Sequence, residues 1–301
     1  MRLLSFRNGA GPRIGARADA ALIDVVAAHE ARVAEDGGSG AALPTDMVAL
    51  LEGGDEALDA ARAAIEFAAG RDDLTIDEGD VELLPVVPRP PKIICVARNY
   101  GKHAAEAGLD VLKEPNLFIR FPRSLVADGE PILVPKVSEQ VDWEAELAVV
   151  IGKGGKHIPA DVAYDHVAGY ALFNDVSIRD WQLRKPPVQF GAGKNFDGSG
   201  PFGPELVTRD EVPDPHALSI SLQVNGETMQ SSNTGDMLFD IPTLIAYISK
   251  FTTLEPGDVI ATGTPEGVGH FRQPPVYLRP GDRVRVEIEG VGVQENPVVA
   301  E

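Results

Sequence analysis

The stretch VDWEAELAVVIG, residues 141–152, alternates acidic and apolar side chains in the way expected of a β-strand with two different faces. In a strand, Asp142, Glu144 and Glu146 would share one face. The other face would carry the apolar side chains of Val141, Trp143, Ala145, Leu147, Val149 and Ile151. Like charges on one face repel one another, so either water solvates the three carboxylates or a cation lies among them. The stretch therefore predicts a strand with one apolar face and leaves open what neutralises its acidic face.

The composition limits the classes of protein and partner. The chain has 301 residues, a formal net charge of −19 and one cysteine, Cys95. The length suits one large domain or a large domain with a smaller one. The negative charge disfavours nucleic acids and anionic membranes as partners, and no run of about 18 apolar residues predicts a membrane span. Residues 1–15 lack the apolar stretch of a secretory signal, and a single cysteine suits a reducing compartment. We therefore expect a cytoplasmic protein in which Cys95 packs in an apolar strand.

The first 85 residues differ from the rest of the chain in composition and in their predicted secondary structure. Residues 1–85 are rich in alanine and contain strand candidates at 2–6 and 13–18. Residues 83–92, LLPVVPRPPK, contain too many prolines for a helix or a central strand and read as a linker. We therefore predict a small N-terminal α/β domain over residues 1–85 and a second domain over residues 86–301.

Helix signals in the first domain are local and specific. In PTDMVALLEGG, Thr45 or Asp46 is the expected N-cap, and Gly53 marks the end of the helix. The next segment favours a second helix with Asp55 as its N-cap and Gly70 at its end.

Residues 86–301 consist mostly of short apolar or alternating runs separated by glycine and proline, which is typical of a large, mainly antiparallel sheet system. Asn225-Gly226 between two alternating runs predicts a hairpin. Helical candidates are few: one begins near Asn99, one near Pro159, and one spans residues 239–254.

Three further positions could carry chemistry. Asp175 follows the apolar run YALF, where a carboxylate is costly unless it is paired or bound to metal, but it could equally cap the next helix. His103 and Glu106 lie at i and i+3, so on a helix the carboxylate could orient the imidazole as a general base. Lys194, in a glycine-rich loop, could meet a carboxylate or an enolate oxygen. Alternatively, His103 and Glu106 are a pair on an exposed helix without a catalytic role, and Lys194 is an ordinary surface lysine.

Several common catalytic motifs are missing from the sequence. There is no P-loop, G-x-S-x-G elbow, H-E-x-x-H helix or C-x-x-C pair, and GKGGK at residues 152–156 reads as a turn.

Taken in order, six segments resemble the fumarylacetoacetate hydrolase family: VARNYGKHAAEAG (96–108), VDWEAELAVVIGK (141–153), GYALFNDVSIRD (169–180), GKNFDGSGPFGP (193–204), NGETMQSSNTGDMLF (225–239) and LEPGDVIATGTPEGVG (254–269). The resemblance covers residues 92–298. It implies an α+β fold whose catalytic domain is a mainly antiparallel, mixed β-roll of this family's type, preceded here by the small α/β domain.

The resemblance also implies site residues. The family's metal carboxylates fall on Glu144, Glu146 and Asp175, with Mg²⁺ or Mn²⁺ as the cofactor. Asp142, on the same face, stays open, with support of the metal ligands as one role. The catalytic pair of acylpyruvase-like members matches His103 and Glu106. Lys194 matches the lysine of G-K-x-x-D and Thr264 the threonine of T-G-T-P.

One departure bears on the substrate. Fumarylacetoacetases proper carry a fourth metal-binding aspartate ahead of the catalytic histidine segment, where this sequence reads Arg98-Asn99-Tyr100. The chain is therefore more similar to the acylpyruvase and oxaloacetate-decarboxylase-like branch, a group that implies roles in aromatic catabolism.

The resemblance implies a divalent-metal-dependent hydrolase that cleaves a carbon–carbon bond in 2,4-diketo acids such as acylpyruvates or fumarylpyruvate. A water activated by His103 and Glu106 would attack, and the metal and Lys194 would stabilise the enolate. The same site could decarboxylate oxaloacetate or isomerise a 2-oxo-diene-dioate. An alternative of another class is a non-catalytic metal or carboxylate binder.

Specificity and assembly are less constrained. Arg98, Gln189 and Arg184 are candidate contacts to a distal group of the substrate. The family resemblance suggests a homodimer, and the apolar segment MLFDIPTLIAYI (237–248) could line a subunit interface or be a buried core helix.

Overall fold

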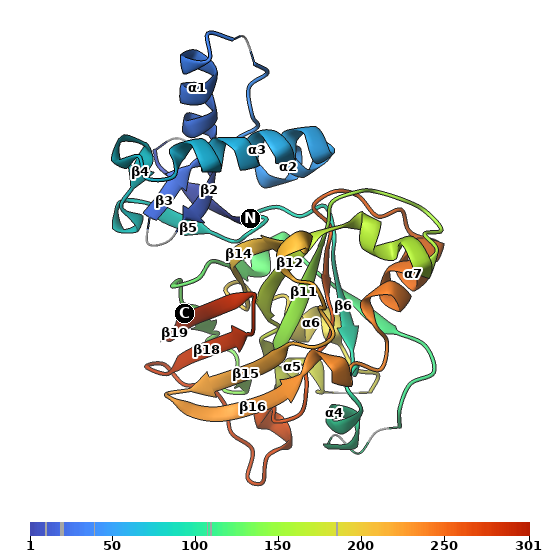
Figure 1. Cartoon of the computed structure of the whole chain (residues 1–301). Helices are drawn as coiled ribbons and strands as arrows, with labels where there is room; N and C mark the ends of the chain where they lie inside the picture. Colours follow the sequence, from blue (N-terminus) through green and yellow to red (C-terminus); the bar gives the residue numbers. More distant parts are fainter. Residues whose placement is uncertain (10, 19–20, 39, 107, 109, 185) are drawn as a thin grey trace.

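The fold was analysed in a computed structural model, which describes residues 1–9, 11–18, 21–38, 40–106, 108, 110–184 and 186–301. Figure 1 shows a smaller N-terminal part above a larger body that consists mainly of strands. No helix in these described ranges is long and apolar enough to cross a membrane.

The N-terminal part pairs short strands with three α-helices. Its strands are β1 (Arg2–Arg7), β2 (Pro12–Ala18), β3 (Ala21–Asp24), β4 (Thr75–Ile76) and β5 (Glu82–Leu84). Its helices are α1 (Val25–Glu35), α2 (Met47–Glu52) and α3 (Gly54–Ala68), with the 3₁₀ helices η1 (Asp72–Leu74) and η2 (Glu78–Asp80).

Two of the predicted helix caps can be compared with the structure. Asp46 caps α2, because its side chain accepts hydrogen bonds from the backbone N–H groups of Val48 and Ala49. The prediction for Asp55 is wrong: Gly53 occupies the N-cap of α3, and Asp55 lies in the first turn. A carboxylate in the first turn still interacts favourably with the positive end of the helix dipole, which explains why the sequence signal lies so close to the true start.

The larger body contains the remaining strands. They are β6 (Ile93–Ala97), β7 (Asn116–Arg120), β8 (Leu125–Val126), β9 (Ile132–Val134), β10 (Val141–Asp142), β11 (Ala145–Ile151), β12 (Val167–Asn174), β13 (Ser177–Ile178), β14 (Gly200–Thr208), β15 (Ser219–Val224), β16 (Glu227–Asn233), β17 (Val259–Ala261), β18 (Arg283–Ile288) and β19 (Gly292–Ala300).

The helices of the body are short except for one. They are α4 (Gly101–Glu106), α5 (Arg179–Gln182), α6 (Phe190–Lys194), α7 (Ile241–Phe251), η3 (Pro122–Ser124), η4 (Ala160–His166), η5 (Arg209–Glu211), η6 (Thr234–Asp236) and η7 (Gly269–Phe271). The helix expected near Pro159 is thus a 3₁₀ helix, η4. The buried side chains of α7 include Leu244, Ile245 and Ile248, so core packing explains its apolar sequence.

The strands of the described residues form one large sheet, one smaller sheet and a two-stranded sheet of β10 and β13. The large sheet has the order β4-β3-β2-β1-β14-β12-β11-β17-β6-β7, and the smaller one β16-β15-β18-β19-β9. Neighbouring strands are antiparallel except for β6 with β17, β8 with β14 and β9 with β19. The mainly antiparallel α+β architecture predicted from the sequence is therefore confirmed. The hairpin at Asn225-Gly226 is also confirmed, with positive φ angles of 52° and 82°.

β11 lies between two hydrophobic cores. Leu147, Val149 and Ile151 join a cluster that contains side chains of β15 and β18, whereas Ala148 and Val150 join a cluster that contains side chains of the N-terminal helices. The apolar face predicted for residues 141–151 lies entirely in the first cluster. Both faces of the strand are covered, which places any charged group at its beginning inside the protein.

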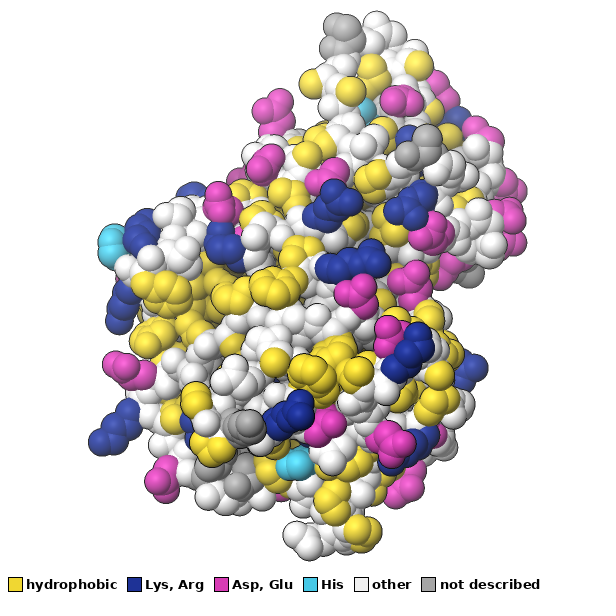
Figure 2. Space-filling view, turned by 180° about the vertical axis from the view of Figure 1, so that it is seen from behind, with side chains coloured by type: hydrophobic (Ala, Val, Ile, Leu, Met, Phe, Trp, Pro, Cys, Tyr) yellow, Lys and Arg dark blue, Asp and Glu magenta, His cyan; other side chains and the backbone are white. Residues whose placement is uncertain are grey.

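The two parts of the molecule share the large sheet, because β1 pairs with β14. Ion pairs also join them: Glu205 contacts both Arg2 and Arg17, and Arg62 contacts Asp210. Figure 2 shows acidic and basic side chains side by side at the narrowing between the two parts. Residues 85–92 contain neither helix nor strand. We propose the boundary at residues 85 and 86 on this basis, although the sheet continues across it.

Candidate active site

Three carboxylates converge where β11 begins and β12 ends. Glu144 directly precedes β11, Glu146 lies on it, and Asp175 directly follows β12. β11 and β12 are antiparallel neighbours, with Ala145 opposite Asn174, so the three side chains meet. One oxygen from each lies within 4.8 Å of the others, and all three residues are buried. This acidic face is therefore not an exposed surface of the protein, which disfavours solvation by bulk water as the explanation for the sequence pattern.

Asp175 is not a helix cap. The N-cap of the following helix, α5, is Ile178, and no side chain among the described residues caps it. The Asp175 carboxylate instead accepts hydrogen bonds from Lys194 Nζ at 2.6 Å and from an Arg120 guanidinium nitrogen, also at 2.6 Å. Asp175 is thus held among cations at the end of a buried strand.

Lys194 bridges two of the three carboxylates. Its Nζ donates to Glu144 Oε2 at 2.8 Å as well as to Asp175, and its side chain is 1% exposed. It ends the short helix α6 in the glycine-rich segment that the sequence suggested. The predicted contact of Lys194 with carboxylates is present within the protein itself, whereas its contact with an enolate stays a prediction.

Arg120 was not identified from the sequence. It is 1% exposed and, besides Asp175, it contacts Ser199 Oγ at 2.7 Å and the backbone oxygen of Val176 at 3.2 Å. An arginine inside the apolar run NLFIRF needs a buried anion, and that mismatch is the signal that could have indicated its role.

Asp142 lies beside the three carboxylates but faces a different partner. Its Oδ2 accepts from Arg179 Nε at 2.8 Å, and Arg179 also donates to Glu144 at 2.7 Å. Asp142 further accepts from the backbone N–H groups of Gly269 and His270, at 2.7 and 2.9 Å. Asp142, whose role the sequence left open, therefore positions the guanidinium of Arg179, and Arg179 in turn pairs with Glu144.

The cations act unequally on the carboxylates. Burial by itself would raise the pKa of Glu144, but the charges of Lys194 and Arg179 outweigh it and hold that pKa below its ordinary value. Burial and the negative charges of Asp175 and Glu144 raise the pKa of Glu146 well above its ordinary value. Among the described residues, Glu146 has no cationic partner, and its one hydrogen bond comes from the N–H of Gly263, at 2.9 Å.

This imbalance fits a bound cation. A buried carboxylate is stable as an anion only when it is paired or coordinates a metal. Carboxylate oxygens are the ligands that Mg²⁺ and Mn²⁺ prefer. Glu144, Glu146 and Asp175 supply three such ligands, and Glu146 is left uncompensated without an ion. The donor set therefore fits a divalent metal.

α4 carries the His–Glu pair close to this cluster. His103 Nδ1 lies 3.5 Å from Glu106 Oε2, but the two are not aligned as a hydrogen bond, and Nδ1 has no other hydrogen-bond partner in the described residues. Glu106 accepts from the backbone N–H of Gly267, at 3.1 and 3.2 Å. His103 is buried against Phe271, with ring centroids 6.0 Å apart. The two side chains are close enough for the hydrogen bond that their i and i+3 spacing predicts, although it is not formed in this structure. Hydrogen bonds between catalytic groups are often long in a free enzyme and shorten when the substrate binds.

The carboxylate cluster and α4 line one cavity of about 260 Å³. Its wall includes the sequence-predicted residues Arg98, His103, Glu144, Glu146, Lys194 and Thr264. It also includes residues that the sequence did not indicate, namely Asn116, Phe118, Arg179, Gln182 and Phe271.

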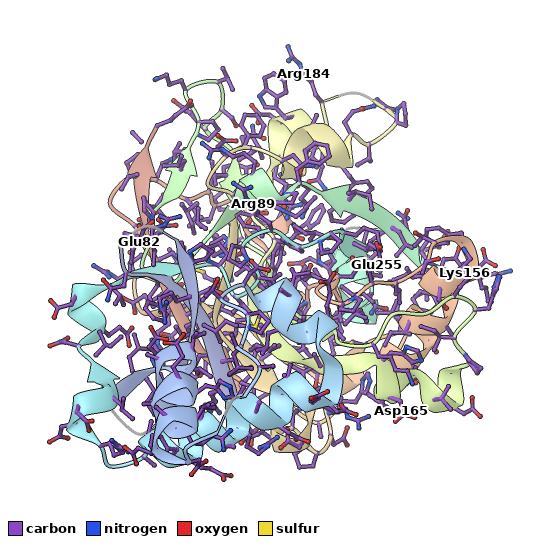
Figure 3. All side chains as sticks on the ribbon, turned by 90° about the horizontal axis from the view of Figure 1, so that it is seen from above. Glu82, Arg89, Lys156, Asp165, Arg184 and Glu255 are labelled. Atoms are coloured by element: carbon purple, nitrogen blue, oxygen red, sulfur yellow. The ribbon has the colours of Figure 1, made fainter. Side chains whose placement is uncertain are left out.

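Two predicted substrate contacts do not reach this cavity. Gln189 is exposed, and its side-chain amide donates to the backbone oxygen of Pro187 at 3.3 Å. Arg184 lies over the ring of Trp181, and Figure 3 shows it pointing away from the body of the protein. Neither residue lines the cavity, and the segment between them includes residue 185, which is outside the described residues.

Comparison with known proteins places this arrangement in a family. The protein-family model described as fumarylacetoacetate (FAA) hydrolase C-terminal matches residues 92–299 of this chain. The oxaloacetate tautomerase fahd2, mitochondrial, of Xenopus laevis is 48% identical over 257 residues, covering 85% of this chain and 79% of that protein.

Solved structures agree with the sequence comparison. Fumarylacetoacetate hydrolase from psychrophilic Exiguobacterium antarcticum has a TM-score of 0.81 at 36% identity, covering 100% of both chains. Maleylpyruvate hydrolase from Sphingobium sp. SYK-6, solved in complex with manganese(II) and pyruvate, has a TM-score of 0.76 at 32% identity, covering 100% of this chain and 99% of that one. Together with the buried carboxylates and the cavity above them, these matches show that the chain is a member of the fumarylacetoacetate hydrolase family of enzymes.

Proposed function

We propose that this protein is a divalent-metal-dependent enzyme that interconverts the enol and keto forms of a small 2-oxo acid, with oxaloacetate as the first substrate to test. The observation that carries this proposal is the placement of His103, a proton-transfer group, on the same cavity wall as the carboxylates Glu144 and Glu146. The similarity to an oxaloacetate tautomerase over 85% of the chain supports the choice of reaction.

Glu144, Glu146 and Asp175 would hold the metal. When bound, Mg²⁺ or Mn²⁺ would supply positive charge for the carboxylate and the 2-oxo oxygen of the substrate. The structure of maleylpyruvate hydrolase with manganese(II) and pyruvate supports a divalent ion in this fold. Lys194, Arg179 and Arg120 keep the remaining carboxylate charges paired, so the site does not repel an anionic substrate as strongly as its acids alone would.

His103 would move the proton. In going from enol to keto form, the enol oxygen loses a proton, the carbon–carbon double bond becomes a carbon–oxygen double bond, and C3 gains a proton. One group that accepts and returns a proton suffices, and no water is consumed. Glu106 lies near Nδ1 of His103, which leaves Nε2 for the substrate. The contact of Glu106 with the Gly267 N–H holds this helix end against the turn after β17.

A second candidate is hydrolysis of the carbon–carbon bond in a 2,4-diketo acid such as an acylpyruvate or fumarylpyruvate. The His103–Glu106 pair favours it, because such a base can deprotonate a water that attacks the distal carbonyl. The structural similarity to maleylpyruvate hydrolase supports the same reaction class. Decarboxylation of oxaloacetate and isomerisation of a 2-oxo-diene-dioate would use the same carboxylates, and decarboxylation needs no attacking water.

A non-catalytic metal or carboxylate binder is the alternative of another class. It would need the three carboxylates but not the pair on α4. The burial of His103 on the cavity wall therefore favours an enzyme.

The proposal is tested by assaying the metal-loaded protein on three reactions side by side. These are ketonisation of enol-oxaloacetate, pyruvate release from oxaloacetate and pyruvate release from acetylpyruvate, each with and without chelator. We expect His103→Asn to lower the principal activity by about 10²–10⁴-fold, the usual effect of a positioned proton-transfer group. His157→Asn is the matched control, because His157 is exposed and lies outside the cavity wall.

The Glu106→Gln variant tests whether Glu106 orients His103 in the hydrolytic reaction. Hydrolysis of acetylpyruvate should fall if Glu106 orients the base, and an unchanged rate would refute that role. If the metal-loaded wild type accelerates none of the three reactions, the proposal itself is wrong.

A further inference from the structure

The cavity wall carries three cationic side chains: Arg98, Arg179 and Lys194. Two of them are already fully engaged. Lys194 donates to Glu144 and to both the side chain and backbone oxygen of Asp175, and Arg179 donates to Asp142, Glu144 and Gln182. Neither is available to a substrate without giving up these contacts.

Arg98 differs from both. Within the described ranges, its guanidinium has neither a hydrogen-bond nor an ion-pair partner, although the residue is only partly exposed. An arginine on the wall of a cavity without a partner leaves five donors for a ligand. Its planar geometry matches a carboxylate, which it can bind through two parallel hydrogen bonds.

The backbone at Arg98 is held in an unusual conformation. Its φ angle is 59°, in the left-handed region that residues other than glycine seldom adopt. The next residue, Asn99, fixes it there: the Asn99 side chain donates to the backbone oxygens of Phe239 and Thr262 and accepts from the Phe239 N–H. Strain kept in place by surrounding contacts is typical of ligand-binding positions.

A second polar side chain lies beside Arg98. Asn116, at the start of β7, is directly opposite Ala97 on β6 and also lines the cavity. Its side-chain amide has no hydrogen-bond partner in the part of the chain that the structure describes. Two residues further along the same face of β7, Phe118 stacks on Phe190, with ring centroids 4.7 Å apart. The same cavity wall also carries the apolar side chains of Val96 and Val188.

We propose that Arg98 and Asn116 form a subsite for the second carboxylate of a 2-oxo dicarboxylate, and so select dicarboxylates over monocarboxylates. The inference rests on the proposed function, which places the 2-oxo acid end of the substrate at Glu144, Glu146 and Asp175. The distal carboxylate accepts hydrogen bonds from the Arg98 guanidinium and from the Asn116 amide. The apolar surroundings strengthen this pairing because they exclude water.

Binding of malate and 2-hydroxybutyrate to the Mg²⁺-loaded protein tests the subsite without relying on turnover. The two 2-hydroxy acids have the same chain length and differ in a carboxylate against a methyl group at C4. Calorimetric titration should show that the wild type binds malate about 10- to 100-fold more tightly, as expected for a charge-assisted hydrogen-bonded pair.

Arg98→Met should remove this preference by weakening malate binding to the level of 2-hydroxybutyrate, whose affinity should stay the same. Asn116→Asp provides a second variant that leaves the strained backbone untouched, and its added negative charge should also weaken malate binding selectively. Arg123→Met is the matched control, because Arg123 is 86% exposed in its side chain and pairs with Asp197 outside the cavity.

The outcomes separate this inference from the proposed function. Equal affinity of the wild type for both acids, or an equal loss of both in Arg98→Met, overturns the subsite. If oxaloacetate is turned over and Arg98→Met leaves its kcat/KM unchanged, the subsite fails while the proposed function stands. If malate binding depends on Arg98 but no 2-oxo acid is turned over, the subsite stands and the proposed function fails.

Discussion

Two stretches of the molecule alternate charged and apolar side chains in the same way. One is the beginning of β11 with the residues before it, and the other is β18, Arg283–Ile288. In β18 the apolar residues are buried, and the charged ones face solvent, where Arg283 pairs with Glu295 at 2.9 Å. At β11 the charged residues are buried together with the apolar ones.

The difference in burial between the two strands shows what an alternating sequence pattern does and does not predict. Alternation assigns side chains to two faces, but it does not reveal what covers each face. The polar face of β18 is covered by water, so its charges need no fixed partners. The acidic residues at β11 are buried, so each charge needs a cation: Lys194, Arg179 and Arg120 pair with the other carboxylates, and Glu146 is left without one among the described residues.

The largest effect should follow from removing the metal ligands at β11. Chelation of the metal, or Glu146→Gln, should reduce turnover of the 2-oxo acid to background, because the bound cation supplies the charge that an enolate next to a carboxylate requires. Steady-state assays with added Mg²⁺ or Mn²⁺ measure this. Glu287→Gln makes the same change on β18 and should retain full activity, and equal losses in both variants would show that the two strands do not differ in this way.

Breaking a buried pair should have the next largest effect. Arg120→Met leaves Asp175 without one of its two cations, and we expect a loss of about 3–5 kcal/mol in the free energy of unfolding. Urea denaturation measures it, provided the slope of the transition is unchanged. A loss below about 1 kcal/mol, the range of exposed ion pairs, would mean that Asp175 is solvated in the protein.

Glu146→Gln should stabilise the metal-free protein. Burial and the charges of Asp175 and Glu144 raise the pKa of Glu146, so its ionised form weakens the fold once the pH exceeds the ordinary pKa of glutamate. A neutral glutamine can still accept the hydrogen bond from Gly263, and we expect the Tm at neutral pH to rise by about 2–4 °C, which corresponds to roughly 1 kcal/mol. The gain should shrink as the pH falls toward the ordinary pKa. A lower Tm in chelator-treated Glu146→Gln would contradict this view.

The smallest effect is expected at β18. Arg283 and Glu295 have side chains that are 63% and 41% exposed, so Arg283→Met should change the free energy of unfolding by no more than about 0.5 kcal/mol. Urea denaturation under the conditions used for Arg120→Met gives the comparison directly. A loss as large as that of Arg120→Met would show that exposure does not explain the contrast.

The carboxylates could be singled out from the sequence because their signal is local, and the family resemblance then implied their role as metal ligands. The alternation around Glu144 and Glu146 and the acid at the end of a buried run at Asp175 are each visible within a few residues. The hairpin at Asn225-Gly226 was predictable for the same reason, since its turn chemistry lies in two adjacent residues.

Lys194 was among the predicted site residues, but the other two cationic partners of these carboxylates, Arg120 and Arg179, were not predicted, because they are distant in sequence. Arg120 is 55 residues from Asp175, and Arg179 is 35 from Glu144. Only the folded sheet brings them together. Gln189 shows the limit of a local signal: its place in a polar loop suggested a substrate contact, but in the structure its amide donates to the backbone oxygen of Pro187 and the residue does not line the cavity.

The most direct test of the account is a titration of the metal-free protein with Mn²⁺, followed by calorimetry or electron paramagnetic resonance. The account predicts one tightly bound ion per chain in the wild type, and its loss in a Glu144→Gln, Glu146→Gln, Asp175→Asn variant that remains folded. An ion that binds the triple variant as tightly as the wild type, or a wild type that binds none, would contradict it.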